Sequence, residues 1–200
     1  MRNALTLVGI GAIVIVIGIF FAVHHPFSSS PDTSSITSTT TPMTSSFSLS
    51  SSAFEQNASI PSRFTCDGDR NLSPALSISG VPEGAKSLVL LVDDPDIPKV
   101  IKPDGVFDHW VLYDIPPETT EIPEGGSVGT VGSNGAGDKA YRGPCPPKEY
   151  EPSEHRYFFK LYALDAMLNL PPGASKSQVL EAMKGHMVAE TQLIGKYKRP

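Results

Sequence analysis

The sequence predicts a mainly β domain with short C-terminal helices, preceded by an N-terminal transmembrane helix. Three observations lead to this fold class. Three short runs are rich in apolar and β-branched residues, one segment near the end carries a helix-capping pattern, and the first residues form an almost unbroken apolar stretch. The chain has 200 residues, which is enough for one ordinary domain and one further segment.

The apolar stretch runs from Ala4 to Val23, and Thr6 is its one clearly polar side chain. Its length is close to the roughly 20 residues that a helix needs to cross a bilayer. A cleaved secretory signal is the competing interpretation, but it would have a shorter apolar core and a small-residue cleavage site. We therefore expect residues 1–27 to be an uncleaved signal anchor, with secretion after cleavage as the alternative.

The basic residues predict the topology of this anchor. Arg2 lies before the apolar stretch, and no Lys or Arg follows it until Arg63. By the positive-inside tendency, the amino terminus is cytoplasmic and the rest of the chain is outside. We expect a single-pass protein of the cell membrane whose globular part is extracytoplasmic.

Residues 28–52 and 53–200 differ in composition. The first segment is a Ser/Thr tract with too few large apolar residues to bury a core, so we expect a disordered tether. The second has the size of a single domain. Its basic residues are scattered in a chain of formal net charge −5, so we expect no nucleic-acid partner.

Three strands are predicted in the globular part. Ser87–Val92 follows a Pro-Glu-Gly turn and ends in Asp-Pro, and His109–Ile115 is stopped by two prolines. His155–Leu164 is apolar at both odd and even positions. That pattern is typical of central strands that are covered on both faces.

The remaining segments are predicted from their turn and cap residues. The Gly-rich stretch from Gly125 to Gly143 should be a loop with at most short strands. Ser175 and Gln178 have the spacing of a capping box at the start of a helix, which Gly185 can terminate. Residues 186–194 form either a second short helix or a last strand.

Two histidines open two of the predicted strands, and each follows an acidic residue. Asp108 precedes His109, and Glu154 precedes His155. A carboxylate that accepts a hydrogen bond from one ring nitrogen fixes the tautomer and raises the proton affinity of the imidazole, which leaves the other nitrogen as a donor. Two such donors that face each other would hold an anion.

Further residues can complete such a pocket. Asp-Pro turns after the first strand place two carboxylates at the same end of the sheet, a Pro-rich turn supplies a rigid wall because proline fixes φ, and a tyrosine adds a hydroxyl donor. The candidate ligand-binding residues are Asp94, Asp96, His109, Gly143, Pro144, Cys145, Pro146, His155 and Tyr157.

Other interpretations stay open for the same residues. Each histidine can simply be satisfied by its own acidic neighbour at a strand edge. A metal site of two histidines and one carboxylate is a further alternative, although wide spacing and flanking prolines make it a weak one. The chain has no phosphate-binding Gly loop with its lysine, no CxxC pair and no HExxH motif, so no cofactor is expected.

The same motifs favour a binding protein over an enzyme. Ser, Thr and Lys are absent from the core motifs, and no sequence feature lowers the pKa of the Cys145 thiol between its prolines. We therefore predict binding without turnover. A weak hydrolase that uses His109 and His155 as acid and base is an alternative.

From about Ala53 to its end, the chain resembles the phosphatidylethanolamine-binding protein family, specifically its prokaryotic Raf-kinase-inhibitor-like branch. The order and joint presence of the matching motifs make the resemblance specific. They include Thr65-Cys66-Asp67-Gly68, Asp94-Pro95-Asp96-Ile97-Pro98, His109-Trp110-Val111-Leu112-Tyr113, Gly143-Pro144-Cys145-Pro146-Pro147, His155-Arg156-Tyr157 and Gly185-His186.

The resemblance implies antiparallel β-sheets in a Greek-key arrangement with C-terminal helices. It also implies a small anion pocket for phosphate-like groups, including phospholipid headgroups. By motif position, the lining of this pocket is Asp94, His109, Pro144 to Pro146, His155 and Tyr157, with Asp96 in support. This set agrees with the pocket that the residues themselves suggest.

Two departures from the family pattern bear on the ligand and the partner. Gly135-Ala136-Gly137-Asp138 replaces a more usual Ser-Phe-Gly-Lys, and the segment from Lys99 to Phe107 lengthens the approach to His109. The resemblance makes an inhibitor of an extracellular serine protease a second functional hypothesis, with the longer segment as the inhibitory loop.

Cys66 and Cys145 are the two cysteines of the chain. In a domain outside the cell, thiols tend to oxidise, and a disulfide between these two would fix the Pro-rich wall. Both residues also lie in motifs of the resemblance and can be packed singly. The sequence leaves both possibilities open.

Overall fold

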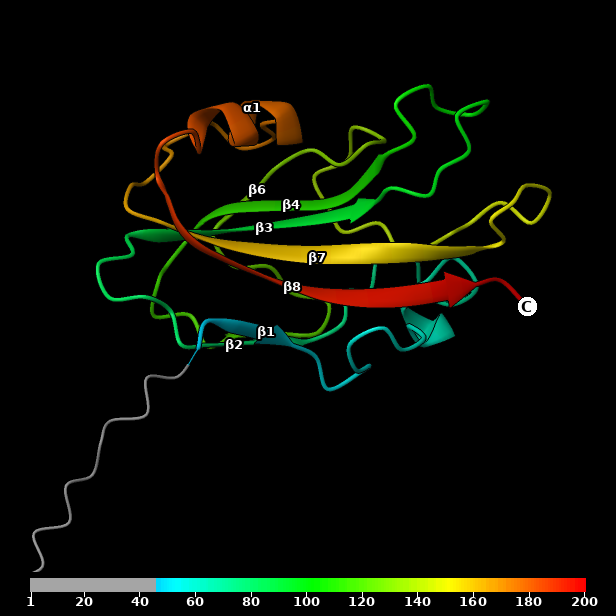
Figure 1. The fold of residues 1–200 in the computed structure, drawn as a ribbon, viewed down its shortest axis with the longest axis horizontal. Helices are drawn as coiled ribbons and strands as arrows, with labels where there is room; N and C mark the ends of the chain where they lie inside the picture. Colours follow the sequence, from blue (N-terminus) through cyan, green and yellow to red (C-terminus); the bar gives the residue numbers. More distant parts are fainter. Residues whose placement is uncertain (1–45) are drawn as a thin grey trace, which may run out of the picture. The chain divides into compact units, whose positions relative to one another are not determined.

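The computed structural model describes residues 46–200, which fold into two antiparallel sheets. Figure 1 shows the smaller sheet on one face of the larger sheet and helix α1 on the other. The smaller sheet has the order β1 (Ser48–Ser50), β2 (Leu76–Ser79), β5 (Glu121–Ile122), and the larger has β6 (Thr130–Val131), β4 (Phe107–Ile115), β3 (Ser87–Asp94), β7 (Glu154–Leu164), β8 (Met187–Lys198). A short 3₁₀ helix spans Ser62–Phe64.

The central strands of the larger sheet are covered on both faces. Every residue of β3 is buried, which explains its continuous apolar sequence. One core lies between the two sheets and includes Leu76, Ile122, Leu90, Leu112, Tyr157 and Phe159. A second core lies on the other face and includes Val89, Leu91, Val111, Tyr113 and Val179 of α1.

The three predicted strands are present, and each is slightly longer than predicted. β3 continues through Asp93 and Asp94, β4 begins at Phe107, and β7 begins at Glu154. The ambiguous segment after Gly185 is a strand, because β8 pairs with β7 from Met187 to Lys198. The mainly β character of the predicted fold is therefore confirmed.

Helix α1 (Lys176–Ala182) begins at the predicted capping box. The Ser175 hydroxyl accepts a hydrogen bond from the backbone N–H of Gln178, and the Gln178 side chain accepts one from the backbone N–H of Ser175. Gly185 follows the helix with φ of 80°, a conformation that glycine adopts without strain. Local sequence thus determines both ends of this helix.

A β-bulge in β4 positions one of the two histidines. Val92 of β3 pairs with Trp110, but the next residue, Asp93, pairs with Asp108. His109 is the extra residue between these two pairs, and His109 and Trp110 are both buried. A bulge bends its strand and redirects a side chain, and here it turns His109 out of the regular alternation.

The predicted fold class is corrected on two points. It included several C-terminal helices, whereas the described residues have one α-helix, α1, which is followed by strand β8. It also included an N-terminal transmembrane helix. Within residues 46–200, no helix is both long and apolar enough to cross a membrane. The one α-helix of this part has seven residues and is about 10 Å long, whereas a bilayer core is about 30 Å thick. The predicted span, Ala4 to Val23, lies outside the described residues.

The domain also begins earlier in the chain than predicted. The tether was expected at residues 28–52, but Ser48–Ser50 form β1 and pair with β2. A Ser-rich segment can form this strand because its one buried side chain, Leu49, packs into the core between the sheets. The other part of the predicted tether, residues 28–45, lies outside the described residues.

Candidate functional site

His155 lies near the start of β7 and is fully buried. Its Nδ1 is 2.7 Å from Oδ2 of Asp94, which is also buried. The other carboxylate oxygen of Asp94 accepts a hydrogen bond from the backbone N–H of Asp96 at 2.9 Å. This arrangement fixes the orientation of the His155 ring, and its Nε2 is buried without a hydrogen-bond partner.

His109 is held by the backbone carbonyl of Arg142, which accepts a hydrogen bond from its Nδ1. In return, the N–H of Arg142 donates to the carbonyl of His109 at 2.9 Å. Because a carbonyl can only accept, Nδ1 carries a proton. Burial lowers the pKa of the His109 imidazole, although this hydrogen bond and the charge of Asp94 oppose the shift. Its Nε2 is also buried without a partner.

Tyr157 is two residues after His155, so both side chains point to the same face of the sheet. Its ring meets the His109 ring edge to face, with 5.2 Å between centroids. Burial, and then the negative charge of Asp94, raise the pKa of the Tyr157 phenol. The hydroxyl therefore keeps its proton, and it is buried without a hydrogen-bond partner.

The two Nε2 atoms and the Tyr157 hydroxyl form an unusual group. Within residues 46–200, four buried side-chain nitrogen or oxygen atoms have no partner, and three of them belong to these residues. The fourth, Ser73 Oγ, belongs to a residue that lines a different cavity. Buried polar groups are nearly always hydrogen-bonded, so three unpaired groups around one carboxylate indicate a place for a ligand or ordered water.

A cavity of about 250 Å³ opens above these groups. Asp94 and His109 line it directly, and the fully buried His155 and Tyr157 contact these two residues. The other lining residues are Arg70, Ile97, Phe107, Arg142, Gly143 and Cys145. Sequence reasoning did not identify Arg70, Ile97, Phe107 or Arg142 as site residues. Three of them had a signal in the sequence: Ile97 stands in the Asp-Pro-Asp-Ile-Pro motif, Phe107 ends the segment before His109, and Arg142 directly precedes Gly143.

The wall of the cavity joins two distant segments. A disulfide links Cys66 to Cys145 across 79 residues, and the backbone N–H of Cys66 donates to the carbonyl of Pro144 at 3.0 Å. A Cβ atom on Gly143 would lie 2.4 Å from the carbonyl oxygen of Phe64. Glycine is therefore required here because the two backbones approach so closely. Pro144 and Pro146 are buried, and neither lines the cavity.

Three of the acidic residues considered above do not face the cavity. Asp96 pairs with Arg156, Asp108 pairs with Lys176, and Glu154 is exposed. The hypothesis that each histidine is oriented by its acidic sequence neighbour is wrong. Adjacent residues of a strand point to opposite faces, and the carboxylate that orients His155 comes from β3.

The metal-site alternative finds no support in the geometry. Within the part of the chain that the structure describes, no group of three His, Cys, Asp or Glu side chains is arranged to hold a metal ion. The carboxylate beside the two histidines, Asp94, already accepts hydrogen bonds on both oxygens.

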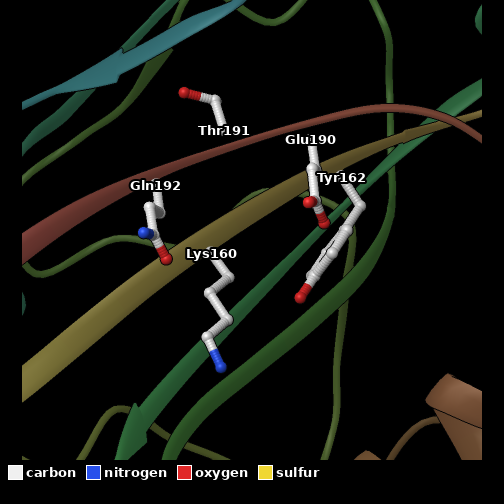
Figure 2. A pocket seen from close by; sticks show the side chains of 5 residues that line it. All are labelled: Lys160, Tyr162, Glu190, Thr191 and Gln192. Carbon is white, nitrogen blue, oxygen red and sulfur yellow. The ribbon is translucent and has the colours of Figure 1, made fainter.

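A second cavity, of about 390 Å³, lies on the α1 face of the larger sheet. Figure 2 shows Lys160 and Tyr162 of β7 on the same side as Glu190 and Gln192 of β8, with Thr191 on the other side. The Lys160 ammonium is 2.9 Å from the Asp93 carboxylate. Because the lining residues include no unpaired buried polar atom, this cavity is a weaker candidate than the histidine site.

Comparison with curated proteins shows close relatives. A UPF0098 protein of Methanothermobacter thermautotrophicus is 51% identical over 158 residues, which cover 76% of this chain and 98% of that protein. The UPF0098 protein PH1269 of Pyrococcus horikoshii is 44% identical over 158 residues, with 74% of this chain and 75% of the relative covered.

Two solved structures have the same fold. CT736 from Chlamydia trachomatis, a homolog of phosphatidylethanolamine-binding protein, has a TM-score of 0.73 and 42% identity, with 78% of this chain and 99% of that chain covered. Escherichia coli YbcL, described as a member of the mammalian PEBP family, has a TM-score of 0.68 and 26% identity. The match covers 78% of this chain and 100% of YbcL.

The family model of phosphatidylethanolamine-binding protein matches residues 50–198. This range contains helix α1, every residue of the histidine site, and both sheets except for the first two residues of β1. The expected kinship is confirmed, and the chain belongs to the phosphatidylethanolamine-binding protein family.

Proposed function

We propose that the histidine site binds a phosphate-type anion, either free or as part of a headgroup or ester. The observation that carries this proposal is the set of three buried, unpaired polar atoms: Nε2 of His109, Nε2 of His155 and the hydroxyl of Tyr157. We expect a ligand with several oxygens to pair with them from the cavity, which His109 lines and which His155 and Tyr157 adjoin through their contacts with Asp94 and His109. The energetic cost of leaving them unpaired, about 1–3 kcal/mol for each group, then favours the bound state.

The protonation of the two histidine rings decides whether each Nε2 donates a hydrogen bond to a ligand oxygen or accepts one from it. Both rings carry a proton on Nδ1 because these atoms face a carbonyl and a carboxylate. Each Nε2 therefore donates only when its imidazole is positively charged, and otherwise accepts. A phosphate group suits such a site because its second pKa is near 6, so it can supply a proton itself. Tyr157 donates in either case.

Charge around the cavity also favours an anion. Arg70 and Arg142 line the opening, and their guanidinium groups are always charged. The carboxylate of Asp94 is the one acidic group in the lining, and His155 pairs with it. A cavity with positively charged walls concentrates anions near its opening.

We propose binding without turnover, in the oxidising environment outside the cytosol. The sulfur of Cys145 is part of a disulfide, so it cannot act as a nucleophile. Neither Nε2 contacts a hydroxyl, whereas an activated nucleophile needs an adjacent base. The disulfide itself supports a location outside the reducing cytosol. Serine protease inhibition and weak phosphoester hydrolysis stay predictions, since no contact of the site favours either.

Calorimetric titration with inorganic phosphate tests this proposal. We expect wild-type protein to bind phosphate and Tyr157→Phe to bind at least about tenfold more weakly, because a hydrogen bond to a charged group contributes about 1.5–3 kcal/mol and 1.4 kcal/mol is a factor of ten. The control is Tyr141→Phe, which removes another buried hydroxyl, one that donates to the carbonyl of Phe64. No heat with wild-type protein, or equal affinity of the Tyr157→Phe variant, would contradict the proposal.

A further inference from the structure

A cavity of about 150 Å³ lies next to the histidine site, and we call it the Trp110 cavity. Three pairs of consecutive residues contribute one member to each of these two spaces, and the pairs are Arg70 and Asn71, His109 and Trp110, and Tyr141 and Arg142. The other residues that line the Trp110 cavity are Ser73, Gly125, Gly126, Ser127, Val131, Lys139 and Ala140. The two cavities are therefore neighbours with separate linings.

Ser73 gives the Trp110 cavity a buried polar group without a partner. This residue is 1% exposed, and its hydroxyl forms no hydrogen bond within residues 46–200. Its backbone carbonyl accepts from the N–H of Gly125 at 3.0 Å, so the main chain holds the residue in place and leaves the hydroxyl free. Because buried hydroxyl groups are nearly always paired, we expect the partner to be a molecule in the cavity.

The charges around this cavity favour an anion. Lys139 is the one charged residue among those that line it, and it forms no ion pair within the part of the chain that the structure describes. Two acidic residues are chain neighbours of the lining, but both pair with arginines, Glu124 with Arg63 and Asp138 with Arg142. The positive charge of Lys139 is thus not cancelled nearby, and it attracts anions to the opening.

Apolar side chains form much of the remaining lining, among them Trp110, Val131 and Tyr141. The Trp110 and Tyr141 rings meet edge to face, with 5.4 Å between centroids. The Tyr141 hydroxyl donates to the carbonyl of Phe64 at 3.2 Å, so it is already paired. Burying a polar atom without a partner costs free energy, so a ligand should place an organic tail against these side chains.

The size and the donors of the cavity limit the ligand further. A volume of about 150 Å³ holds roughly five water molecules, which is the size of a short-chain acid such as propionate. A carboxylate has one oxygen for the Ser73 hydroxyl and one for the Lys139 ammonium. Phosphate or sulfate would place additional oxygens against the apolar lining, where no donor is available.

We propose that the Trp110 cavity binds a small free monocarboxylate with a short aliphatic tail. The carboxylate accepts hydrogen bonds from the Ser73 hydroxyl and the Lys139 ammonium, and the tail packs against Trp110. This site is separate from the histidine site, and it does not depend on the function proposed there.

Fluorescence titration of the full chain tests this inference, because Trp110 is its single tryptophan and lines the cavity. The probes are propionate and propionamide, which have nearly the same shape but differ in charge. We expect wild-type protein to bind propionate about tenfold more tightly than propionamide, because hydrogen bonds to a charged acceptor are the stronger ones. Calorimetry with the same two compounds gives a second measurement of each affinity.

Two variants and two matched controls test the assigned contacts. Ser73→Ala should bind propionate at least about tenfold more weakly, because it loses a buried hydrogen bond to a charged group. Lys139→Gln should reduce the ratio between propionate and propionamide to about three, because one charge-assisted contact remains. The controls Ser77→Ala and Lys86→Gln change exposed residues that do not line the cavity, and they should bind both compounds as wild-type protein does.

The Ser73→Ala variant also distinguishes a binding hydroxyl from a structural one. Since the Ser73 hydroxyl has no partner in the fold, its removal should leave the urea midpoint of unfolding of the ligand-free protein unchanged or higher. Removing a buried hydroxyl that holds the fold by a hydrogen bond would lower this midpoint. A lower midpoint in Ser73→Ala, with propionate affinity unchanged, would overturn the inference.

Comparison with the histidine site completes the test. Tyr157→Phe should leave the affinity for propionate unchanged, whether or not the protein binds phosphate. If Tyr157→Phe weakens propionate binding as much as Ser73→Ala does, propionate occupies the histidine site and the inference fails. It also fails if neither fluorescence nor calorimetry detects propionate binding to wild-type protein, which means that the cavity holds water only. Equal affinities for propionate and propionamide would exclude a carboxylate site as well.

Discussion

His109 is a buried imidazole with no carboxylate on either ring nitrogen. Its pKa in the folded protein is lowered, chiefly by burial, relative to an unfolded value of about 6.5. Between the two pKa values, the unfolded chain binds more protons than the folded one, so stability rises with pH. The contribution of His109 is complete above about pH 6.5 and is lost as the pH falls.

We therefore predict that the free energy of unfolding falls between pH 7.5 and pH 5.5 in phosphate-free buffer, and falls less in His109→Gln. Urea unfolding at the two pH values measures this difference. His186→Gln is the control, because His186 is about half exposed and pairs with Asp165. If wild-type protein and His109→Gln lose the same free energy of unfolding over this pH range, the buried His109 is not the cause of the loss.

At the residue scale, sequence reasoning found the groups and missed most of their partners. His109, His155, Tyr157 and Asp94 were all identified from turns and strand ends. The partner of His109 is a backbone carbonyl 33 residues away, and no side-chain pattern marks a carbonyl. The bulge that turns His109 toward the cavity appears only when β3 and β4 are paired.

Among the elements, α1 shows how local sequence supports a site at a distance. Lys176 is its first residue, and the ammonium lies 2.5 Å from Asp93 and 3.0 Å from Asp108. These acids directly precede Asp94 and His109 in the chain. The helix thus connects the ends of β3 and β4 from the face opposite the cavity.

The capping box should contribute measurably to this connection. We predict that Ser175→Ala lowers the free energy of unfolding by about 1 kcal/mol, the usual effect of removing an N-cap side chain. Denaturant unfolding measures the change. Ser52→Ala, which removes an exposed hydroxyl outside the helix, is the control and should change stability by less than about 0.5 kcal/mol. A Ser175→Ala variant as stable as wild-type protein would show that tertiary contacts alone hold α1.

The elements that sequence reasoning missed are the shortest ones. The three strands of the smaller sheet have two to four residues each, and only β2 has the four residues that an alternating pattern needs. They form because Leu49, Leu76 and Ile122 reach the core between the sheets. β3, β4 and β7 have eight to eleven residues, and their apolar content made them predictable.

In the whole molecule, the disulfide joins the segment after the 3₁₀ helix to the wall of the anion cavity. Cys66 precedes Asp67, which binds Arg199 and the Tyr197 hydroxyl near the chain end. Cys145 lines the anion cavity. One covalent bond therefore connects three regions that are far apart in sequence.

We predict that the double variant Cys66→Ala, Cys145→Ala is less stable by about 4 kcal/mol, because a crosslink over 79 residues restricts the unfolded chain. Urea unfolding measures this change. Since Cys145 lines the binding cavity, the variant should also bind phosphate more weakly at pH 7.5 in the absence of denaturant. The control variant Ser175→Ala should bind phosphate as tightly as wild-type protein. Unchanged stability would show that the hydrogen bond from Cys66 to Pro144 and the close contact at Gly143 hold the wall without the crosslink.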